Sequence, residues 1–494
     1  MRTFEILLLI VNLGLLIICT LWPSRHPLRL RAAAAGITAL LSMIQMVAEG
    51  FRWQMIPVYA ASVLLGLSAL DLILSKHKRS RQPRPGPRFG IRWLRTCVTV
   101  LLLVMYTSVS VALPSLLPVF AFATPSGPHG VGTTSLILVD ERRDEPHTED
   151  PSDHRRLALQ IWYPASVEER PHDKRADYIE HLPVILEGLE QAISIPPFLM
   201  SQLRYVKTHA YWEAEVALDQ ERYPVLLFSH GLTGFRNQNT FQVEDLASRG
   251  YIVVGIDHPY DAAAVVFPDH TAMLKLDNLS GFEAYEAKNR LWVEDIKFVL
   301  DYLERVSPAE EEHFLSGRMD MDKVGMFGHS FGGATAAQML MEDPRIKASL
   351  NMDGALYGQP IPEEGFDRPY MQMNADTSID YENFVQSLDE AIEASGSSRE
   401  EYEAFWAEMT SRRNHAASGD SAYSIVLAKA DHMSFTDFYL FSPLLALNST
   451  SPRQLHHSVN EVTAAFFDQY VKGEDGISIE RTIDSLHGIT AEQR

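Results

Sequence analysis

Residues 328–333 (GHSFGG) match the G-x-S-x-G pattern, in which a serine hydroxyl is exposed on a sharp turn between a strand and a helix. An apolar run, Val324–Phe327, precedes the motif, and small residues follow it at 333–337. These flanking elements matter, because the pattern alone arises by chance roughly 0.2 times in a chain of this length. The sequence therefore predicts that Ser330 is a nucleophile at the N-terminus of a helix.

A serine hydroxyl becomes a good nucleophile only when a base takes its proton. In this arrangement the histidine comes late in the chain, after the last strands. His432 meets that condition, since it follows the predicted strand Ser424–Ala428. His415 lies in a polar segment without a preceding strand, and His456-His457 precede the last helix, so we interpret these three as solvated or capping residues. His432 is therefore the predicted general base.

Two acids are candidates for orienting that histidine. Asp353 follows the strand after the nucleophile helix, Ala348–Met352, and Asp376 comes soon after the next strand, Tyr370–Met373. Both satisfy the chain order serine, acid, histidine. The spacing of residues therefore leaves Asp353 and Asp376 as equal alternatives.

Backbone N–H groups near the nucleophile must stabilise the negative charge that develops on the carbonyl oxygen during acyl transfer. One donor belongs to the residue after the nucleophile, and the other to a loop that follows an earlier strand. The segment 229–234 (SHGLTG) follows the strand Val225–Phe228. We expect Leu232 and Phe331 to be the two oxyanion donors, and His230 and His329 to shape the site around them.

The chain that must position these residues alternates short apolar strands with helices. The predicted strands are 134–139, 157–163, 225–228, 251–256, 324–327, 348–352, 370–373 and 424–428. The predicted helices are 241–248, 291–303, 332–341 and 459–471. Short, continuously apolar strands alternating with helices are typical of a mainly parallel sheet with helices on both faces. The fold class is therefore predicted to be α/β.

Four apolar stretches occupy the first quarter of the chain, at Ile6–Trp22, Ala32–Val47, Ile56–Leu74 and Cys97–Phe122. A membrane-spanning helix needs about 20 mainly apolar residues, so the second and shortest stretch fits least well. A cleaved signal peptide at 1–22 is disfavoured, because no small-residue cleavage site follows it and further apolar stretches come after. The sequence predicts a transmembrane region of about four helices over residues 1–123.

Lys and Arg residues are concentrated in two of the predicted loops. The first loop contains Arg25, Arg29 and Arg31, and the third, 76–95, contains eight Lys and Arg, whereas the second contains only Arg52. Cytoplasmic loops of membrane proteins carry an excess of positive charge. We therefore expect a multi-pass protein of the cell membrane, with the chain after Phe122 on the extracytoplasmic side.

Charge is distributed very unevenly between the two parts of the 494-residue chain. Residues 1–122 carry 13 Lys and Arg against three acids, a net charge of +10, whereas the remainder carries 30 against 61, a net charge of −31. Such an acidic part argues against a nucleic-acid partner. The two cysteines, Cys19 and Cys97, lie in apolar stretches, so neither a disulfide framework nor a cysteine metal site is expected in the second part. No metal and no cofactor are predicted.

The second part begins after a segment rich in Pro and Gly, Thr124–Gly132. We predict a linker at 124–133 and a single catalytic domain at 134–494. Within that domain the segment 376–423 is long and charged, with helical patterns at 381–394 and 399–409. Two interpretations of this segment are open, a lid over the site or an enlarged crossover helix.

Six segments together resemble the platelet-activating factor acetylhydrolase family, that is, the plasma type and its bacterial relatives. They are LQIWYPA (159–165), PVLLFSHGLTGFR (224–236), DLASRGYIVVGIDH (245–258), GHSFGG (328–333), NMDG (351–354) and DHMSFTDF (431–438). The resemblance implies an α/β-hydrolase fold and calcium-independent hydrolysis of short or oxidised acyl esters of phospholipids. It also implies that the acid is Asp353 rather than Asp376.

The resulting expectation is a membrane-tethered serine esterase that acts on short-chain acyl esters of lipids, similar to a 1-alkyl-2-acetylglycerophosphocholine esterase. Its expected partners are a lipid or small-molecule ester and the membrane, and the sequence indicates no oligomeric state. One alternative is a general carboxylesterase, polyester hydrolase or peptidase of the same fold. Another is a membrane sensor or transporter whose hydrolase-like domain only binds a ligand. That alternative predicts that the serine, the acid or the histidine needed for catalysis is missing, whereas all three are present here in order.

Overall fold

The computed structural model describes residues 1–21, 27–76, 89–166, 174–276, 279, 281–308, 313–395, 398–447 and 449–491. The chain divides into two compact units. The first comprises Met1–Phe120 with two short stretches from later in the chain, Leu199–Val206 and Phe441–Leu444. The second comprises Ala121–Phe198, Lys207–Leu440 and Leu445–Arg494. Each unit is described by itself below.

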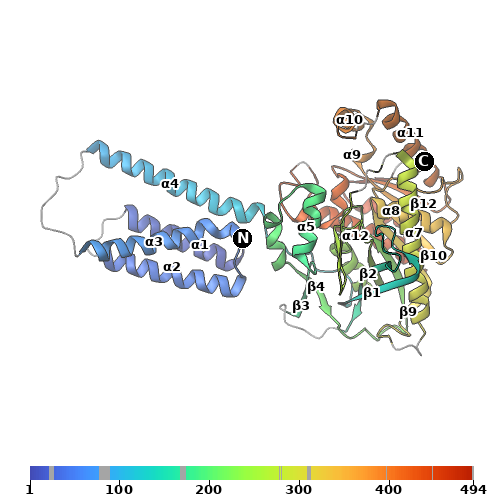
Figure 1. The fold of residues 1–494 in the computed structure, drawn as a ribbon, viewed down its shortest axis with the longest axis horizontal. Helices are drawn as coiled ribbons and strands as arrows, with labels where there is room; N and C mark the ends of the chain where they lie inside the picture. Colours follow the sequence, from blue (N-terminus) through green and yellow to red (C-terminus); the bar gives the residue numbers. More distant parts are fainter. Residues whose placement is uncertain are drawn as a thin grey trace. The chain divides into compact units, whose positions relative to one another are not determined.

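The first unit contains four long helices, α1 (Thr3–Leu21), α2 (Pro27–Glu49), α3 (Ile56–Lys76) and α4 (Phe89–Leu116) (Figure 1). Among the described residues, four helical stretches are long and apolar enough to cross a membrane: Thr3–Leu21, Leu28–Glu49, Trp53–Leu74 and Trp93–Leu116. The second stretch is longer than predicted, because α2 extends through the basic residues before Ala32. The prediction for the fourth stretch was wrong at its end. The helix stops at Leu116 rather than at Phe122, since Pro118 disfavours helical backbone in the residue before it.

Polar side chains hold four helix ends of this unit together. Arg52, just before α3, donates to both carboxylate oxygens of Glu5 on α1, at 2.9 and 3.1 Å. The same guanidinium donates to the carbonyl of Leu117, just after α4, at 2.6 Å. Glu49, the last residue of α2, accepts the backbone N–H of Phe4 at 2.8 Å. The start of α1, the end of α2, the start of α3 and the end of α4 therefore lie at one end, so successive helices alternate in direction.

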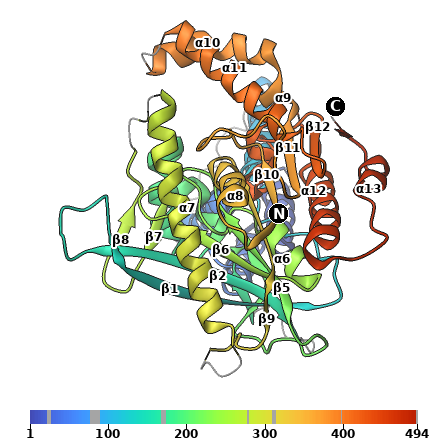
Figure 2. The same cartoon turned by 90° about the vertical axis from the view of Figure 1, so that its right-hand side faces the viewer.

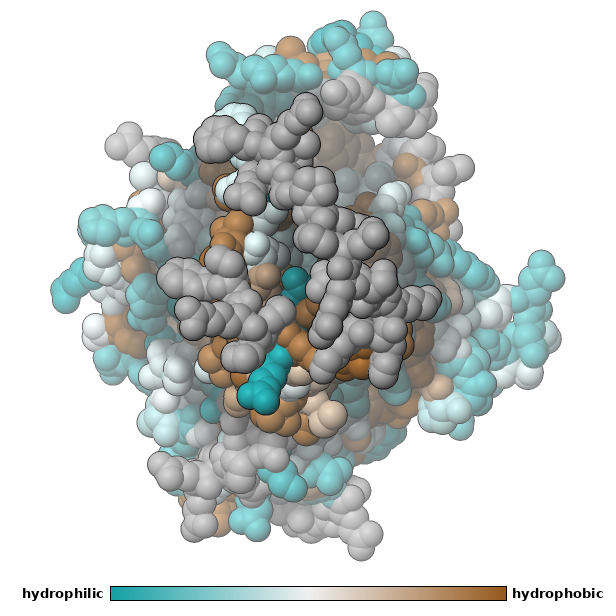
Figure 3. All heavy atoms as spheres, turned by 90° about the vertical axis from the view of Figure 1, so that its left-hand side faces the viewer, coloured by the Kyte–Doolittle hydropathy of each residue, from teal (hydrophilic) through white to brown (hydrophobic). Residues whose placement is uncertain are grey.

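Many large hydrophobic side chains of these helices are exposed. Among them are Ile10, Leu40, Met43, Val47, Leu64 and Leu101. In Figure 3, brown hydrophobic atoms are visible at the surface near the centre of the view. Helices that satisfy their own backbone hydrogen bonds and present apolar side chains outward meet the requirements of a hydrocarbon environment. This unit is therefore suited to a membrane.

The second unit is built on an eleven-stranded sheet with the strand order β13-β12-β11-β10-β9-β5-β6-β2-β1-β4-β3. The neighbours from β12 to β6 all pair in parallel, and β1 pairs in parallel with β4. Antiparallel pairing occurs at β6–β2, β2–β1, β4–β3 and β12–β13. The central strands are β2 (His154–Ala165), β5 (Tyr223–Ser229), β6 (Ile252–Asp257), β9 (Met319–His329), β10 (Ile346–Met352), β11 (Tyr370–Ala375) and β12 (Ala422–Leu427).

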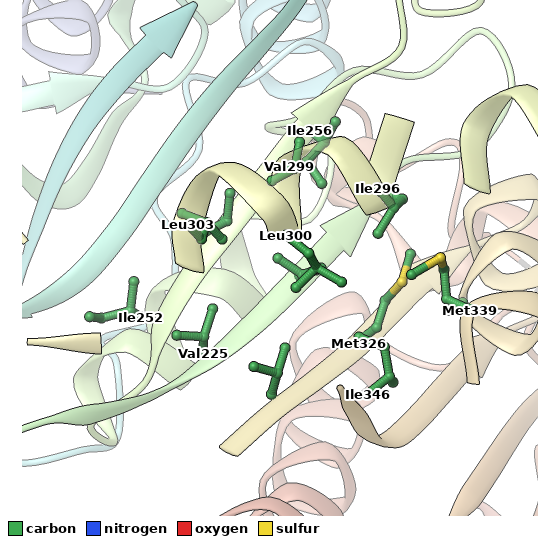
Figure 4. Packing of buried hydrophobic residues seen from close by; sticks show 14 of the residues in the cluster. Val225, Ile252, Ile256, Ile296, Val299, Leu300, Leu303, Met326, Met339 and Ile346 are labelled. Atoms are coloured by element: carbon green, nitrogen blue, oxygen red, sulfur yellow. The ribbon is translucent and has the colours of Figure 1, made fainter. Parts of the chain in front are cut away.

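Helices cover both faces of this sheet, because alternate residues of each strand point to opposite sides. Val324 and Met326 of β9 belong to a core cluster with α7 (Gly281–Val306) and α8 (Phe331–Glu342). Figure 4 shows side chains of α7 packed over the strands in this cluster. Phe327, the residue after Met326, points to the opposite face, and its ring lies 6.0 Å from that of Phe467 in α12 (Pro452–Phe467). On that face α6 (Thr240–Ser248) contacts α12 through a hydrogen bond from Asn460 to Phe241 (Figure 2).

Every predicted strand and helix of the second part is present, but the predicted linker is shorter than 124–133. Strand β1 (Gly130–Asp144) begins inside it, and Gly130–Thr133 pair with β2. The composition of this segment suggests a flexible linker, yet ladder hydrogen bonds need only the backbone, so glycines pair as other residues do. The unpredicted helices and strands are short or lack clear periodicity: β3 (Arg175–Asp177), α5 (Leu182–Ile193), β4 (Lys207–Trp212), β7 (Ala264–Val266), β8 (Thr271–Met273), α9 (Asp376–Ile379), α13 (Ile479–Ser485) and β13 (Ile489–Ala491).

The segment 376–423 carries the connection between the parallel strands β11 and β12. It contains α9 (Asp376–Ile379), α10 (Tyr381–Ser395) and α11 (Arg399–Ala416). Arg412 of α11 donates to the carbonyls of Leu356 and Gly358 at 2.9 and 3.0 Å. Since those residues follow β10, α11 is attached directly to the body of the second unit. A crossover connection of this kind is what two parallel neighbouring strands require.

Candidate active site

Ser330 lies between the end of β9 and the first residue of α8, with φ 55° and ψ −121°. A positive φ is uncommon for a residue with a side chain, so the turn is strained. The turn is also crowded. A Cβ added to Gly332 would lie 2.1 Å from the carbonyl oxygen of Ser229, and one added to Gly328 would lie 2.3 Å from the Gly332 carbonyl. Glycine at 328 and 332 therefore allows the turn to pack against the end of β5.

His432 begins a short 3-10 helix, His432–Phe435, that follows β12. Asp431 caps this helix, since its side chain accepts the N–H of Met433. The Nε2 of His432 is 2.9 Å from the Ser330 hydroxyl oxygen. The predicted base and the predicted nucleophile, 102 residues apart, are thus within hydrogen-bond distance.

Asp353, which follows β10, accepts the Nδ1 hydrogen of His432 on its Oδ2 at 2.7 Å. Its other oxygen accepts the N–H of Ala375 at 2.8 Å, and the Ser378 hydroxyl donates to Oδ2 at 2.7 Å. Asp376 instead accepts the N–H groups of Lys429 and Ala430, at 2.5 and 3.1 Å. Of the two candidate acids, the structure brings Asp353 to His432, while Asp376 holds the backbone that leads to that histidine.

The charges of this group are set by burial and by hydrogen bonding. Burial would raise the pKa of Asp353, but the hydrogen bond and charge of His432 outweigh it and lower that pKa. Desolvation would lower the pKa of His432, and Asp353 outweighs it, so the pKa of the imidazole lies above its ordinary value of 6.5. The His432 side chain is 46% exposed, whereas that of Asp353 is 1% exposed. An accessible base is therefore paired with a buried, ionised acid.

The predicted oxyanion donors lie on the two segments that meet beside Ser330. Phe331 is the first residue of α8, and the first N–H groups of a helix have no partner within it. Leu232 follows Gly231, whose added Cβ would lie 3.0 Å from the Cβ of Ser330. The loop after β5 therefore lies against Ser330, as the predicted roles of Leu232 and Phe331 require.

His329 connects the turn at Ser330 to the segment that carries His432. Its Nε2 donates to the backbone carbonyl of His432 at 2.8 Å, and its Nδ1 accepts from the side-chain amide of Gln238 at 3.1 Å. Burial lowers the pKa of His329 to about 3, so the ring is neutral in this position. This connection agrees with the expectation that His329 shapes the site, and it also identifies Gln238, which no sequence motif indicated.

His456 contacts the same segment, although its position in the sequence had indicated a solvated or capping residue. That interpretation was wrong, because the side chain is buried. Its ring stacks on Phe241 at 3.8 Å, and its Nε2 donates to the carbonyl of Thr436 at 3.1 Å. Asp437, one residue further, accepts the N–H of Thr240 at the start of α6 at 2.7 Å. The segment that carries His432, the predicted base, is therefore fixed at several points.

Among the described residues, no group of three or more His, Cys, Asp or Glu side chains is arranged to hold a metal ion. The expectation that the protein uses neither metal nor cofactor stays a prediction.

A family profile matches most of the second unit. The profile described as "Platelet-activating factor acetylhydrolase, isoform II" covers residues 120–298 and 307–456, more than half of the chain. This match includes all five predicted site residues.

Individual relatives are similar over shorter stretches. Platelet-activating factor acetylhydrolase of Cavia porcellus is 29% identical over 266 residues, which are 48% of this chain and 56% of that protein. The probable 1-alkyl-2-acetylglycerophosphocholine esterase of Arthroderma benhamiae is 27% identical over 300 residues, 56% of this chain and 70% of that protein. The acetylhydrolase of Bos taurus is 31% identical over 184 residues, 33% of this chain and 41% of that protein. The chain thus spans only about half of the animal relatives.

A solved structure is similar over a larger part of the chain. The ferulic acid esterase from Streptomyces cinnamoneus superposes with a TM-score of 0.57 at 27% sequence identity. The superposition covers 76% of this chain and 100% of that protein.

Proposed function

The chain belongs to the platelet-activating factor acetylhydrolase, isoform II, family and has the α/β-hydrolase fold, and on that premise we propose that it is a serine esterase acting on carboxylic esters of lipids. The observation that carries this proposal is the chain of hydrogen bonds from Ser330 to His432 and from His432 to Asp353, at 2.9 and 2.7 Å. The same three residue types in this order activate serine nucleophiles in many hydrolases.

In the proposed reaction, the Ser330 hydroxyl attacks the ester carbonyl carbon while His432 Nε2 takes its proton. Asp353 keeps the imidazole in the required orientation and stabilises its positive charge. The N–H groups of Leu232 and Phe331 donate to the oxygen of the tetrahedral intermediate. His432 then gives its proton to the leaving alcohol, and a water molecule attacks the acyl-serine in the same way, which regenerates Ser330.

Two observations support the proposal that the substrate is a lipid ester, and the first of them also supports a short acyl chain. The relatives are named as acetylhydrolases of platelet-activating factor or as a 1-alkyl-2-acetylglycerophosphocholine esterase. The first unit adds four helices suited to a membrane, and a membrane-tethered enzyme would meet lipid substrates at high local concentration. We therefore propose a membrane-tethered esterase with short-chain lipid esters as substrates.

A fluorophosphonate probe tests the central claim. The detergent-solubilised full chain should be labelled, and Ser330→Ala should abolish labelling and lower kcat by about 10⁶. Ser349→Ala is a matched control, because that buried hydroxyl on β10 has no hydrogen-bond partner among the described residues. Labelling that persists in Ser330→Ala would remove the proposed nucleophile.

Rates on a set of esters test the substrate. Acetyl and butyryl esters, including 2-acetyl ether phospholipids, should react faster than palmitoyl esters, and activity should survive EDTA. Preference for palmitoyl esters, or activity confined to peptides, would contradict the proposal.

Hydroxycinnamoyl esters are a second candidate substrate. The ferulic acid esterase matches along its whole length. In addition, the ring of Tyr357 lies 5.7 Å from that of Phe331, next to the nucleophile, and stacks on Tyr285 at 4.6 Å. Methyl ferulate therefore belongs in the same set, and a higher kcat/KM on it than on the acetyl lipids would favour this second function.

For the membrane topology we propose that the second unit is extracytoplasmic. The even number of candidate spans and the alternating helix directions support this orientation, together with the basic loops. Within these basic segments, residues 25–26 and 77–88 lie outside the described residues, whereas 27–31 begin α2 and 89–95 begin α4. Protease added to intact cells should cleave the chain after Phe122, and protection until lysis would reverse the orientation.

A further inference from the structure

Ser229, His258 and Asp295 form a second hydrogen-bonded chain of the same three residue types as the candidate active site. Ser229 ends β5, His258 follows β6, and Asp295 lies on α7. The Nε2 of His258 is 3.0 Å from the Ser229 hydroxyl, and its Nδ1 is 2.9 Å from the Asp295 carboxylate. All three residues are 0% exposed, so this serine cannot meet a substrate.

The surroundings fix the protonation of this buried chain. Arg155 donates to both oxygens of Asp295, at 3.1 and 2.7 Å, and keeps the carboxylate ionised. Burial lowers the pKa of His258, so its ring is neutral and places its one hydrogen on Nδ1, toward Asp295. Its Nε2 is then an acceptor for the Ser229 hydroxyl. Trp292 stacks on the same ring at 3.8 Å with an interplanar angle of 9°, which prevents the ring from turning.

The buried chain reaches the candidate active site through His230. The backbone N–H of His258 donates to the Nε2 of His230 at 3.2 Å, so the hydrogen of the His230 ring is on Nδ1. That Nδ1 donates to the carbonyl of Gly231 at 2.6 Å. The Gly231 carbonyl and the Leu232 N–H belong to one planar trans peptide, in which they point in opposite directions. Holding the carbonyl therefore orients the N–H of the proposed oxyanion donor.

The next residues of this loop are tied to the segment that follows His258. The N–H of Thr233 donates to the carbonyl of Asp261, and the N–H of Ala263 donates to the carbonyl of Gly234, both at 2.8 Å. The Asp261 carboxylate is itself bound by the Trp292 indole at 2.8 Å. Residues on both sides of the Gly231–Leu232 peptide are thus hydrogen-bonded to one segment, residues 258–263.

We propose that the buried Ser229–His258–Asp295 chain is a positioning device for the oxyanion hole, which acts through His230 on the peptide that carries the Leu232 N–H. These residues never touch the substrate. The proposal rests on the proposed function, because an oxyanion hole matters only if Ser330 performs acyl transfer. It adds to that function a group of residues whose effect is confined to the transition state.

Ser229→Ala is the mildest test, since it removes one hydroxyl and leaves no charge unpaired. We expect kcat to fall about tenfold with KM unchanged, less than the ~10²–10³ lost when an oxyanion donor is removed outright. His258→Asn, which keeps a donor toward Asp295 but loses the ring, should give a larger loss of the same kind. Rates are normalised to sites titrated with the fluorophosphonate, so that misfolded protein does not count.

A trifluoromethyl ketone provides a readout that a merely structural role would not change. It forms a hemiketal oxyanion on the nucleophile, so its Ki should rise by the same factor as kcat/KM falls. Ser349→Ala should leave kcat and Ki within twofold of the unaltered protein. Unchanged kcat per titrated site in Ser229→Ala, or a loss confined to KM, would overturn the proposal. If Ser330→Ala retained activity, the proposed function itself would have failed, and the two failures are thereby distinguished.

Discussion

The two Ser–His–Asp chains of this protein have nearly the same geometry and different surroundings. The hydroxyl-to-imidazole and imidazole-to-carboxylate distances are 2.9 and 2.7 Å around His432, and 3.0 and 2.9 Å around His258. The His432 side chain is 46% exposed, whereas that of His258 is 0% exposed. Distances alone therefore do not separate a group suited to catalysis from a structural one.

The two chains also differ in the groups that bind their acids, Asp353 and Asp295. Asp353 accepts hydrogen bonds from neutral groups besides His432, so its negative charge remains available to stabilise an imidazolium. Asp295 is neutralised by the guanidinium of Arg155. Burial acts to lower the pKa of both histidines. At His432 the hydrogen bond and charge of Asp353 outweigh burial and raise the pKa, whereas at His258 burial prevails over Asp295, and the charge of Arg155 lowers the pKa further. A histidine in the second environment keeps its neutral form and makes a fixed connection.

The largest effect that would test this comparison comes from Asp353→Asn. We expect kcat to fall by about 10⁴, because the amide would hold the imidazole in the wrong tautomer. Asp376→Asn serves as the matched control and should cost much less, since among the described residues the Asp376 side chain accepts only backbone N–H groups, those of Thr377, Lys429 and Ala430. Rates on a chromogenic acetate ester measure both. A severe loss in Asp376→Asn alone would exchange the roles of the two acids.

The next largest effect is a loss of folding stability, which we expect on substitution of Asp295, the acid of the buried chain. Asp295→Asn leaves the buried Arg155 without its main partner, and breaking a buried ion pair costs about 3–5 kcal/mol of unfolding free energy. Because Glu145 also binds Arg155 at 2.9 Å, we expect a loss near 3 kcal/mol. Denaturant unfolding of the solubilised protein measures it. If Asp353→Asn were as destabilising, the contrast between neutral and charged partners would not hold.

The smallest effect is a shift in the pH dependence of the rate. Only the neutral form of His432 accepts a proton, and its pKa is raised by Asp353, so kcat/KM should increase with pH through an inflection above 6.5. In Asp353→Asn the residual activity should show this inflection at lower pH, whereas in Ser229→Ala it should stay in place. An inflection that moves in Ser229→Ala would mean that the buried chain influences the base directly.

Local sequence patterns indicated Ser330 and His432 but gave no sign of the buried Ser229–His258–Asp295 chain, for a physical reason. Ser330 lies in a strand–turn–helix whose glycines are demanded by close packing, and His432 follows a strand, so local patterns identify both. The choice between Asp353 and Asp376 could not be made from spacing, because both come after neighbouring parallel strands, and only the family resemblance favoured Asp353.

The buried residues are different, because nothing in their local sequence distinguishes them. Ser229, His258 and Asp295 come from two strand ends and a helix face, and they meet only when β5, β6 and α7 pack together. The same applies to His456, whose burial depends on Phe241 in another helix. At Gly130–Thr133 the glycine content had indicated a linker, but the backbone of these residues pairs with β2.

The backbone of Ser330 limits which nucleophiles this protein could acquire in evolution or by design. At a φ of 55° a branched Cβ clashes with the main chain, so threonine is excluded although its hydroxyl is chemically adequate. Short unbranched side chains such as cysteine and aspartate remain compatible. A change of reaction type at this position is therefore restricted to thiol or carboxylate chemistry, unless the turn between β9 and α8 is rebuilt at the same time.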